Sequence, residues 1–252
     1  MEVKLTDCYT LSEGKALMSG TEALVRLLLE QSRIDRMNGL RTKGLVSGYP
    51  GSPLGGLDIA LGKAKSFLDE EGIYFQPAVN EELAATALWG SQHINLYDNP
   101  SVQGVFSMWY GKGPGLDRAM DALRHANQGG VAPHGGMVIA VGDDPTGKSS
   151  TLAYQSDQNF HSLGIPYFFP KNVSEIIPMG LEAFALSRYS GCCVGLKIVV
   201  DTADSNAVVD MSRLRPNFPK MMPNNLVHVT KHDPAGARES KLHEIRLPEV
   251  QK

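Results

Sequence analysis

The feature of this chain that most limits its fold is the alternation of short apolar segments with longer segments of helical periodicity. Apolar runs typical of buried strands occupy residues 45–48, 102–108, 137–141 and 194–200. Segments with apolar residues at helical spacing lie at residues 24–37, 57–70, 80–90, 116–126 and 174–189. This order predicts an α/β fold: a doubly wound, mostly parallel sheet with helices on both faces.

In an open parallel sheet, ligands bind beyond the carboxyl ends of the strands. Three loops are expected at that edge, at residues 49–56, 109–115 and 142–150. All three contain glycines, which let a backbone approach a ligand or another segment closely. We therefore expect functional residues in these segments.

The domain organisation follows from where the alternation stops. Residues 1–202 are predicted to be one folded α/β unit, and at 42% hydrophobic residues the chain can bury a core of that size. Beyond residue 203, prolines at 216, 219, 223 and 234 interrupt any period. Residues 203–252 are therefore predicted to be an extended, Pro-rich extension or linker toward a missing downstream domain.

Composition excludes several classes of function. The net charge of −3 gives no basic surface for nucleic acid. The apolar runs are shorter than a membrane span, and we expect a cytoplasmic protein. Three cysteines, two of them adjacent, suggest neither a disulfide framework nor an iron–sulfur cluster. The histidine spacings fit no metal motif, so no metal ligands are assigned.

Residues 142–149, GDDPTGKS, match the phosphate-binding loop pattern G-x-x-x-x-G-K-S and directly follow an apolar run. Such a loop works by pointing successive backbone N–H groups at phosphate oxygens. Pro145 removes one donor, and Asp143 and Asp144 place carboxylates where the phosphates would lie. Nucleotide binding by Gly142–Ser149 stays an alternative function.

Several stretches in order suggest a different function: Gly48–Pro53 (GYPGSP), Asn80–Ala84 (NEELA), Asp143–Pro145 (DDP) and the pair Ser149–Ser150. Together they resemble the N-terminal part of indolepyruvate:ferredoxin oxidoreductase, in its fused long form. That enzyme is one of the thiamine-diphosphate-dependent 2-oxoacid:ferredoxin oxidoreductases. The resemblance implies that this chain is the pyrimidine-binding domain, with the thiamine-diphosphate-binding fold, and that residues 142–149 mimic a phosphate loop by accident.

The resemblance also implies specific site residues. Glu81 would be the catalytic carboxyl group, which bonds the N1′ atom of the aminopyrimidine ring and so favours its imino form. Gly48, Tyr49, Pro50, Gly51 and Ser52 would bind the cofactor near the thiazolium ring or the substrate carboxylate. Glu82 is the second candidate, but it lies about 100° further around the helix. From the pattern alone, both glutamates simply complement a helix dipole.

The complete enzyme would decarboxylate an aryl 2-oxoacid oxidatively, form an acyl-CoA and pass electrons to ferredoxin. The chain lacks the Gly-Asp-Gly…Asn pattern that binds the diphosphate through magnesium, and it lacks clusters of cysteines. A separate diphosphate-binding domain or subunit would supply the magnesium, and iron–sulfur clusters and CoA would be bound elsewhere. We therefore expect a fragment or split subunit, inactive alone, within a homo- or hetero-oligomer. A non-catalytic interaction remnant is the remaining alternative.

Overall fold

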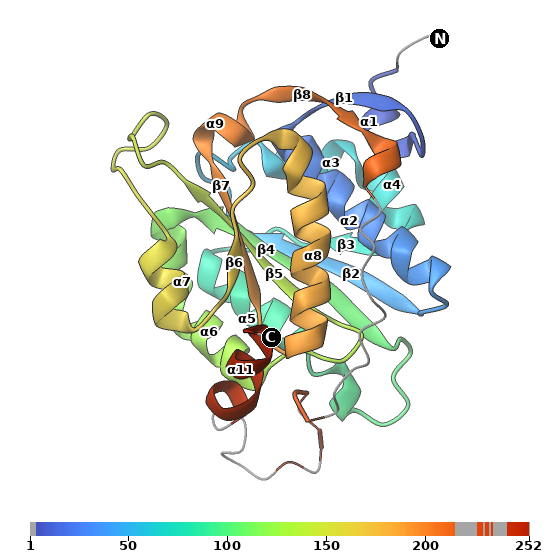
Figure 1. Ribbon diagram of the computed structural model, residues 1–252, viewed down its shortest axis with the longest axis vertical. Helices are drawn as coiled ribbons and strands as arrows, with labels where there is room; N and C mark the ends of the chain where they lie inside the picture. The colour runs from blue at the N-terminus through green and yellow to red at the C-terminus, as the bar shows by residue number, and fades with distance from the viewer. Residues whose placement is uncertain (1–3, 215–225, 229, 232, 234–240, 252) are drawn as a thin grey trace.

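The computed structural model describes residues 4–214, 226–228, 230, 231, 233 and 241–251 (Figure 1). Its centre is a six-stranded sheet in the order β3-β2-β4-β5-β7-β6, and all of its pairings are parallel. The strands are β2 (Thr42–Gly48), β3 (Ile73–Phe75), β4 (Gly104–Lys112), β5 (Met137–Asp143), β6 (Tyr167–Phe168) and β7 (Val194–Val199). The predicted parallel α/β fold is confirmed.

Helices cover both faces of this sheet. One face packs against α2 (Gly20–Met37), α3 (Leu57–Lys63), α4 (Lys65–Glu70) and α8 (Val173–Ser190). The other packs against α5 (Glu81–Ser91), α6 (Gly113–Gly129) and α7 (Asp157–Leu163). In Figure 1, α8 lies in front of the sheet and α5 behind it. Side chains alternate along each strand, so the two faces carry separate hydrophobic cores, as in β4, where Met108 joins the first core and Trp109 the second.

Local signals in the sequence set the starts of two of these helices. The spacing of Ser19 and Glu22 in the sequence predicts a capping box before α2. Ser19 accepts a hydrogen bond from the Glu22 N–H, and the Glu22 carboxylate accepts one from the Ser19 N–H, so the capping box is present. Asn80 caps α5 by accepting the N–H of Leu83 at 2.9 Å. Helix α8, in contrast, begins after Asn172, one residue before the helical segment 174–189 predicted from the sequence.

The remaining elements are short. They are α1 (Asp7–Thr10), η1 (Ile94–Leu96), α9 (Val200–Ala203), η2 (Met211–Arg213), η3 (Leu242–Arg246) and α11 (Leu247–Val250). Among the described helices, none combines the length and the apolar character that crossing a bilayer requires.

A separate two-stranded antiparallel ribbon joins the early and late parts of the chain. Strand β1 (Lys15–Ser19) pairs with β8 (Asn206–Asp210), and Leu17 lies opposite Val208. The predicted boundary after residue 202 therefore does not mark the end of packed structure, because β8 needs β1 for its hydrogen bonds. The prolines at 216, 219, 223 and 234 lie outside the described residues. The role of residues 1–202 as a pyrimidine-binding unit stays a prediction.

The C-terminal residues are attached through Arg246, which is fully buried. Its guanidinium donates to the main-chain oxygens of Val227 at 2.7 Å, Asn127 at 3.1 Å and Gln128 at 2.8 Å. Two of these carbonyls belong to the last turn of α6, where a positive charge complements the helix dipole. Arg246 therefore fixes the C-terminal helices against the last turn of α6.

Candidate functional site

The carboxyl ends of β2, β4 and β5 meet at one edge of the sheet, where the sequence predicts three loops. The segment 109–115 differs from that expectation. Residues 109–112 continue β4, and Lys112 is paired with Gly142 of β5. Gly113–Gly115 then form the first turn of α6, where Pro114 is tolerated because the N–H groups of a first helical turn have no partner within the helix. A rigid strand-to-helix junction therefore replaces the predicted loop.

Glu81 is the first residue of α5, and its side chain is turned inward. The residue is 7% exposed, while its neighbour Glu82 is exposed. The indole N–H of Trp109 donates to the main-chain oxygen of Glu81 at 2.9 Å, which ties the start of α5 to β4. The two glutamates therefore point in different directions, as their helical spacing requires.

The Glu81 carboxylate lies against the beginning of α6. A Cβ atom on Gly115 would lie 2.7 Å from Glu81 Oε1, so the absence of a side chain at position 115 leaves the carboxylate its space. The Nε atom of Arg118 is 3.9 Å from Glu81 Oε2, and this arginine is largely exposed. The carboxylate thus lies between the α6 backbone and a cation at the surface.

Gly48–Ser52 follow β2 directly and lie at the same edge of the sheet. The main-chain oxygen of Gly48 accepts the N–H of Ala78 at 3.2 Å, which joins this segment to the residues leading into α5. A Cβ on Gly48 would overlap the main-chain oxygen of Tyr110. Gly51 packs against the side chain of Lys112 at the start of α6.

The other three predicted cofactor-binding residues are on the surface. Tyr49, Pro50 and Ser52 are exposed, and the Tyr49 N–H donates to the Tyr110 main-chain oxygen at 3.2 Å. Within the described residues, no hydrogen bond or ion pair joins Ser52 to Glu81. The structure thus places all the predicted residues at one edge, with Glu81 buried and Tyr49, Pro50 and Ser52 open to solvent.

The segment that matches a phosphate loop is closed by its own side chain. The Asp144 carboxylate accepts the N–H groups of Lys148 at 2.9 Å, Ser149 at 2.6 Å and Ser150 at 2.8 Å. Burial raises the pKa of Asp144, but the bonds from Ser149 and Lys148 outweigh it and hold the pKa below its usual value. The N–H groups that would bind a phosphate are therefore already used, and the next helix, α7, begins only at residue 157.

Asp143 and Lys197 form a buried charged cluster that sequence reasoning missed. Asp143 is fully buried, and one carboxylate oxygen accepts the N–H and the hydroxyl of Ser156, each at 2.8 Å. The Lys197 ammonium is 3.5 Å from that oxygen and 2.5 Å from Asp157. Burial raises the pKa of Asp143 despite these contacts. The available signal was a lysine inside the apolar run 194–200.

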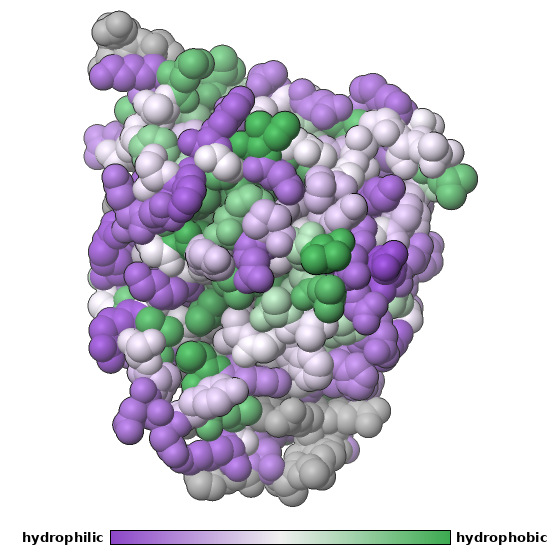
Figure 2. All heavy atoms as spheres, turned by 180° about the vertical axis from the view of Figure 1, so that it is seen from behind, coloured by the Kyte–Doolittle hydropathy of each residue, from purple (hydrophilic) through white to green (hydrophobic). Residues whose placement is uncertain are grey.

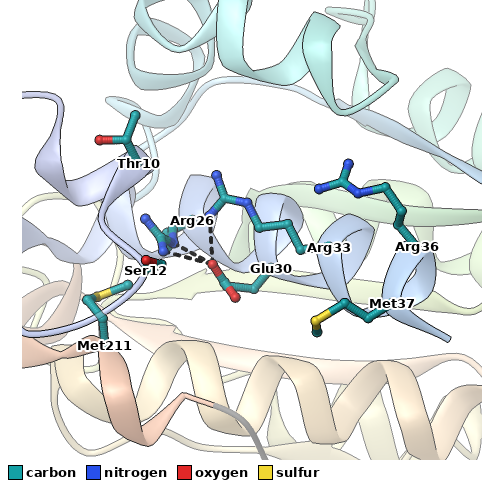
Figure 3. Close-up of a pocket in the computed structure, with 8 residues that line it drawn as sticks. All are labelled: Thr10, Ser12, Arg26, Glu30, Arg33, Arg36, Met37 and Met211. Carbon is teal, nitrogen blue, oxygen red and sulfur yellow. Dashed lines mark hydrogen bonds and ion pairs between the residues drawn. The ribbon is translucent and has the colours of Figure 1, made fainter.

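A cavity of about 260 Å³ lies along α2, away from these loops (Figure 3). Its residues include three arginines from α2, and each is paired with a carboxylate within 2.8 Å: Arg26 and Arg33 with Glu30, and Arg36 with Glu71. Figure 3 shows the first two converging on the same Glu30 carboxylate. Arg36 joins α2 to the end of α4 through Glu71. Arg26 and Arg33 join α2 to α1 by donating to the main-chain oxygens of Cys8 and Tyr9. The cavity residues are therefore occupied in holding these helices together.

Among the described residues, no group of three or more His, Cys, Asp or Glu side chains is arranged to hold a metal ion.

The surface opposite to the view of Figure 1 carries hydrophobic areas between hydrophilic ones (Figure 2). Exposed apolar side chains flank Glu81 in the sequence: Val79 is 81% exposed and Leu83 is 52% exposed. The start of α5 thus exposes apolar groups to solvent, and such a surface is suited to packing against another domain or subunit.

In sequence, this chain is similar to subunits of oxidoreductases. No protein-family model matches the chain. It is 27% identical over 214 residues to the indolepyruvate oxidoreductase subunit IorA of Methanothermobacter marburgensis, covering 84% of this chain and 31% of the relative. It is 28% identical over 219 residues to the subunit of the same name from Pyrococcus abyssi, covering 84% of this chain and 29% of the relative. The chain thus spans about a third of the length of these relatives.

A solved structure shows the same fold. The 2-oxoglutarate:ferredoxin oxidoreductase from Magnetococcus marinus, with 2-oxoglutarate, coenzyme A and succinyl-CoA bound, superimposes with a TM-score of 0.58 at 18% identity. The match covers 89% of this chain and 34% of that chain. Over most of its length, then, this chain is similar to the indolepyruvate oxidoreductase subunit IorA, and the resemblance noted in its sequence is confirmed.

Proposed function

We propose that this chain is the pyrimidine-binding part of a thiamine-diphosphate-dependent 2-oxoacid:ferredoxin oxidoreductase of the indolepyruvate type. The observation that carries the proposal is the buried carboxylate of Glu81 at the carboxyl edge of a parallel sheet, in a chain similar to IorA. An acidic group held out of water at a helix start is the one protein group that activation of the cofactor requires. The bound cofactor supplies the carbon nucleophile and electron sink for decarboxylation.

The residues present fit the aminopyrimidine ring. The carboxyl group of Glu81 would form a hydrogen bond with the ring's N1′ atom, and Trp109 fixes the main chain from which that group projects. Gly48 and Gly51 leave the backbone close to neighbouring segments, and Tyr49 and Ser52 are accessible to a ligand. Lys112, packed on Gly51, borders the same edge.

The diphosphate and its magnesium would be bound by a second domain or subunit. Support comes from the length of the relatives, about three times that of the match. Exposed Val79 and Leu83 beside Glu81 offer an apolar surface for such a partner. Oxidation of the 2-oxoacid to an acyl-CoA, with electrons passed through iron–sulfur clusters to ferredoxin, would then be a property of the whole assembly.

The test compares two adjacent carboxylates in the protein purified together with its native partners. Glu81→Gln keeps the shape but removes the ionisable group, and 2-oxoacid decarboxylation with thiamine diphosphate and Mg²⁺ should fall by about 100-fold or more. Glu82→Gln is the matched control and should stay within about twofold of wild type, because Glu82 is exposed. Near-normal decarboxylation by Glu81→Gln would refute the assignment.

A further inference from the structure

Two residues of helix α6 lie next to the carboxylate of Glu81. Gly115 and Arg118 are three residues apart, so they lie on the same face of α6. A Cβ atom on Gly115 would come within 2.7 Å of Glu81 Oε1, and the Nε atom of Arg118 is 3.9 Å from Oε2. Both oxygens of the Glu81 carboxylate therefore lie close to one face of α6.

The charges around the Glu81 carboxylate also favour its position against α6. Arg118 is the one cation that forms an ion pair with Glu81 among the described residues. The amino end of α6 adds the positive end of a helix dipole of 17 residues. Attraction from α6 therefore draws the carboxylate toward that helix, while Trp109 holds its main chain on β4.

The side chains of Glu81 and Arg118 differ in their exposed fraction, and this difference indicates what each contributes. The Glu81 side chain is 9% exposed and the Arg118 side chain is 59% exposed. A largely exposed arginine contributes little to folding through such a pair. Its guanidinium can nevertheless restrict the rotamers of a buried carboxylate that has few other partners, which matters when that group must meet a ring nitrogen in one orientation.

We propose that Arg118 is a positioning residue, which together with the space left by Gly115 fixes the direction of the Glu81 carboxyl group. This inference rests on the proposed function, because the orientation of Glu81 matters only if it bonds the aminopyrimidine. Arg118 acts through Glu81 and does not itself contact the reacting atoms.

The experiment is a double-mutant cycle on thiamine diphosphate affinity, measured by isothermal titration with Mg²⁺ on the protein purified with its native partners. Arg118→Met should weaken binding by about 3- to 10-fold in the wild-type background. In the Glu81→Gln background the same change should have almost no effect, because the group it positions is gone. Arg118→Lys keeps the charge and should restore most of the affinity.

A matched control comes from the same helix. Arg124 bonds the main-chain oxygen of Ser162 at 2.8 Å, away from Glu81, and Arg124→Met should bind the cofactor like wild type. If Arg118→Met weakens binding equally in both backgrounds, it acts independently of Glu81 and the positioning role is wrong. If Glu81→Gln itself leaves affinity and decarboxylation unchanged, the proposed function fails instead, so the two failures are distinct.

Discussion

The guanidinium of Arg188 forms two parallel hydrogen bonds to the carboxylate of Asp35, at 2.6 and 2.8 Å, and so joins α8 to α2 on one face of the sheet. The side chain of Asp35 is 1% exposed, and its oxygens also accept bonds from Gln31 at 2.8 Å and Thr42 at 2.6 Å. A buried carboxylate with this many donors is stable only while the donors remain.

Removal of that arginine should be costly. Arg188→Met leaves the Asp35 charge buried without its cation, and the free energy of unfolding should fall by about 3 kcal/mol in a urea titration. Lys65→Met breaks an ion pair with Asp69 in which both side chains are mostly exposed, and it should cost less than about 0.5 kcal/mol. Equal losses in the two variants would show that burial of Asp35 does not govern the effect.

Gly115→Ala should separate stability from cofactor binding. The new methyl group would lie 2.7 Å from Oε1 and 2.8 Å from Cγ of Glu81, so the whole Glu81 side chain must move. Alanine favours helix over glycine by up to ~1 kcal/mol, which offsets the cost of that movement, and the unfolding free energy should change by less than about 1 kcal/mol. Thiamine diphosphate affinity, measured by titration calorimetry, should nevertheless fall.

The control for that variant is Gly90→Ala on α5, where an added Cβ meets no described atom within 4 Å. It should gain stability without any change in affinity. If Gly115→Ala binds the cofactor as tightly as wild type, Glu81 does not depend on the space beside α6.

Asp144 should make stability depend on pH on the acid side. Its folded pKa is depressed, because the N–H bonds from Ser149 and Lys148 outweigh burial. The stabilisation is therefore complete above the unfolded value of about 3.9 and is lost as pH falls through the folded pKa. The stability difference between wild type and Asp144→Ala, from urea titrations, should be present at pH 7 and shrink below about pH 4. A difference that is constant over this range would contradict the role of the carboxylate.

Asp143 should behave in the opposite sense. Burial raises its folded pKa, so its favourable contribution is present below the unfolded pKa and is lost as pH rises through the folded value. Asp143→Asn can still accept from Ser156, and Lys197 keeps Asp157 as its partner. Relative to wild type, Asp143→Asn should therefore gain stability between pH 4 and pH 7. A relative loss over that interval would show that Lys197 stabilises the ionised form of Asp143 enough to overcome burial.

Helix caps and the order of helices and strands could be predicted from the sequence. Contacts between elements that are distant in the sequence could not. The cap at Asn80 and the capping box at Ser19 depend on residues three apart, so the sequence predicts them directly. Gly111–Gly115 read as a loop, because four of its five residues are glycine or proline. Pairing with β5 and the tolerance of a first helical turn for proline make it a strand and a helix instead.

The candidate site shows the same division. The segment 49–56 was predicted to lie at the sheet edge, and it follows β2 there, beside the residues that lead into α5 and Glu81. The role of Glu81 stays a prediction from the resemblance. Arg118 and Trp109 were not predicted, because their contacts with Glu81 depend on how α5, α6 and β4 pack. Leu242 and Arg246 showed no sequence period, yet both are buried against the main body.

The ribbon of β1 and β8 also sets an order of events during synthesis. Strand β1 leaves the ribosome early, but its partner follows only after all six strands of the central sheet. At ~5 to 20 residues per second, β1 waits on the order of ten seconds or more with its backbone groups unpaired. A chain released before residue 206 would therefore contain all six strands of the central sheet but leave β1 unpaired, and a chaperone or a second chain could pair with its open edge.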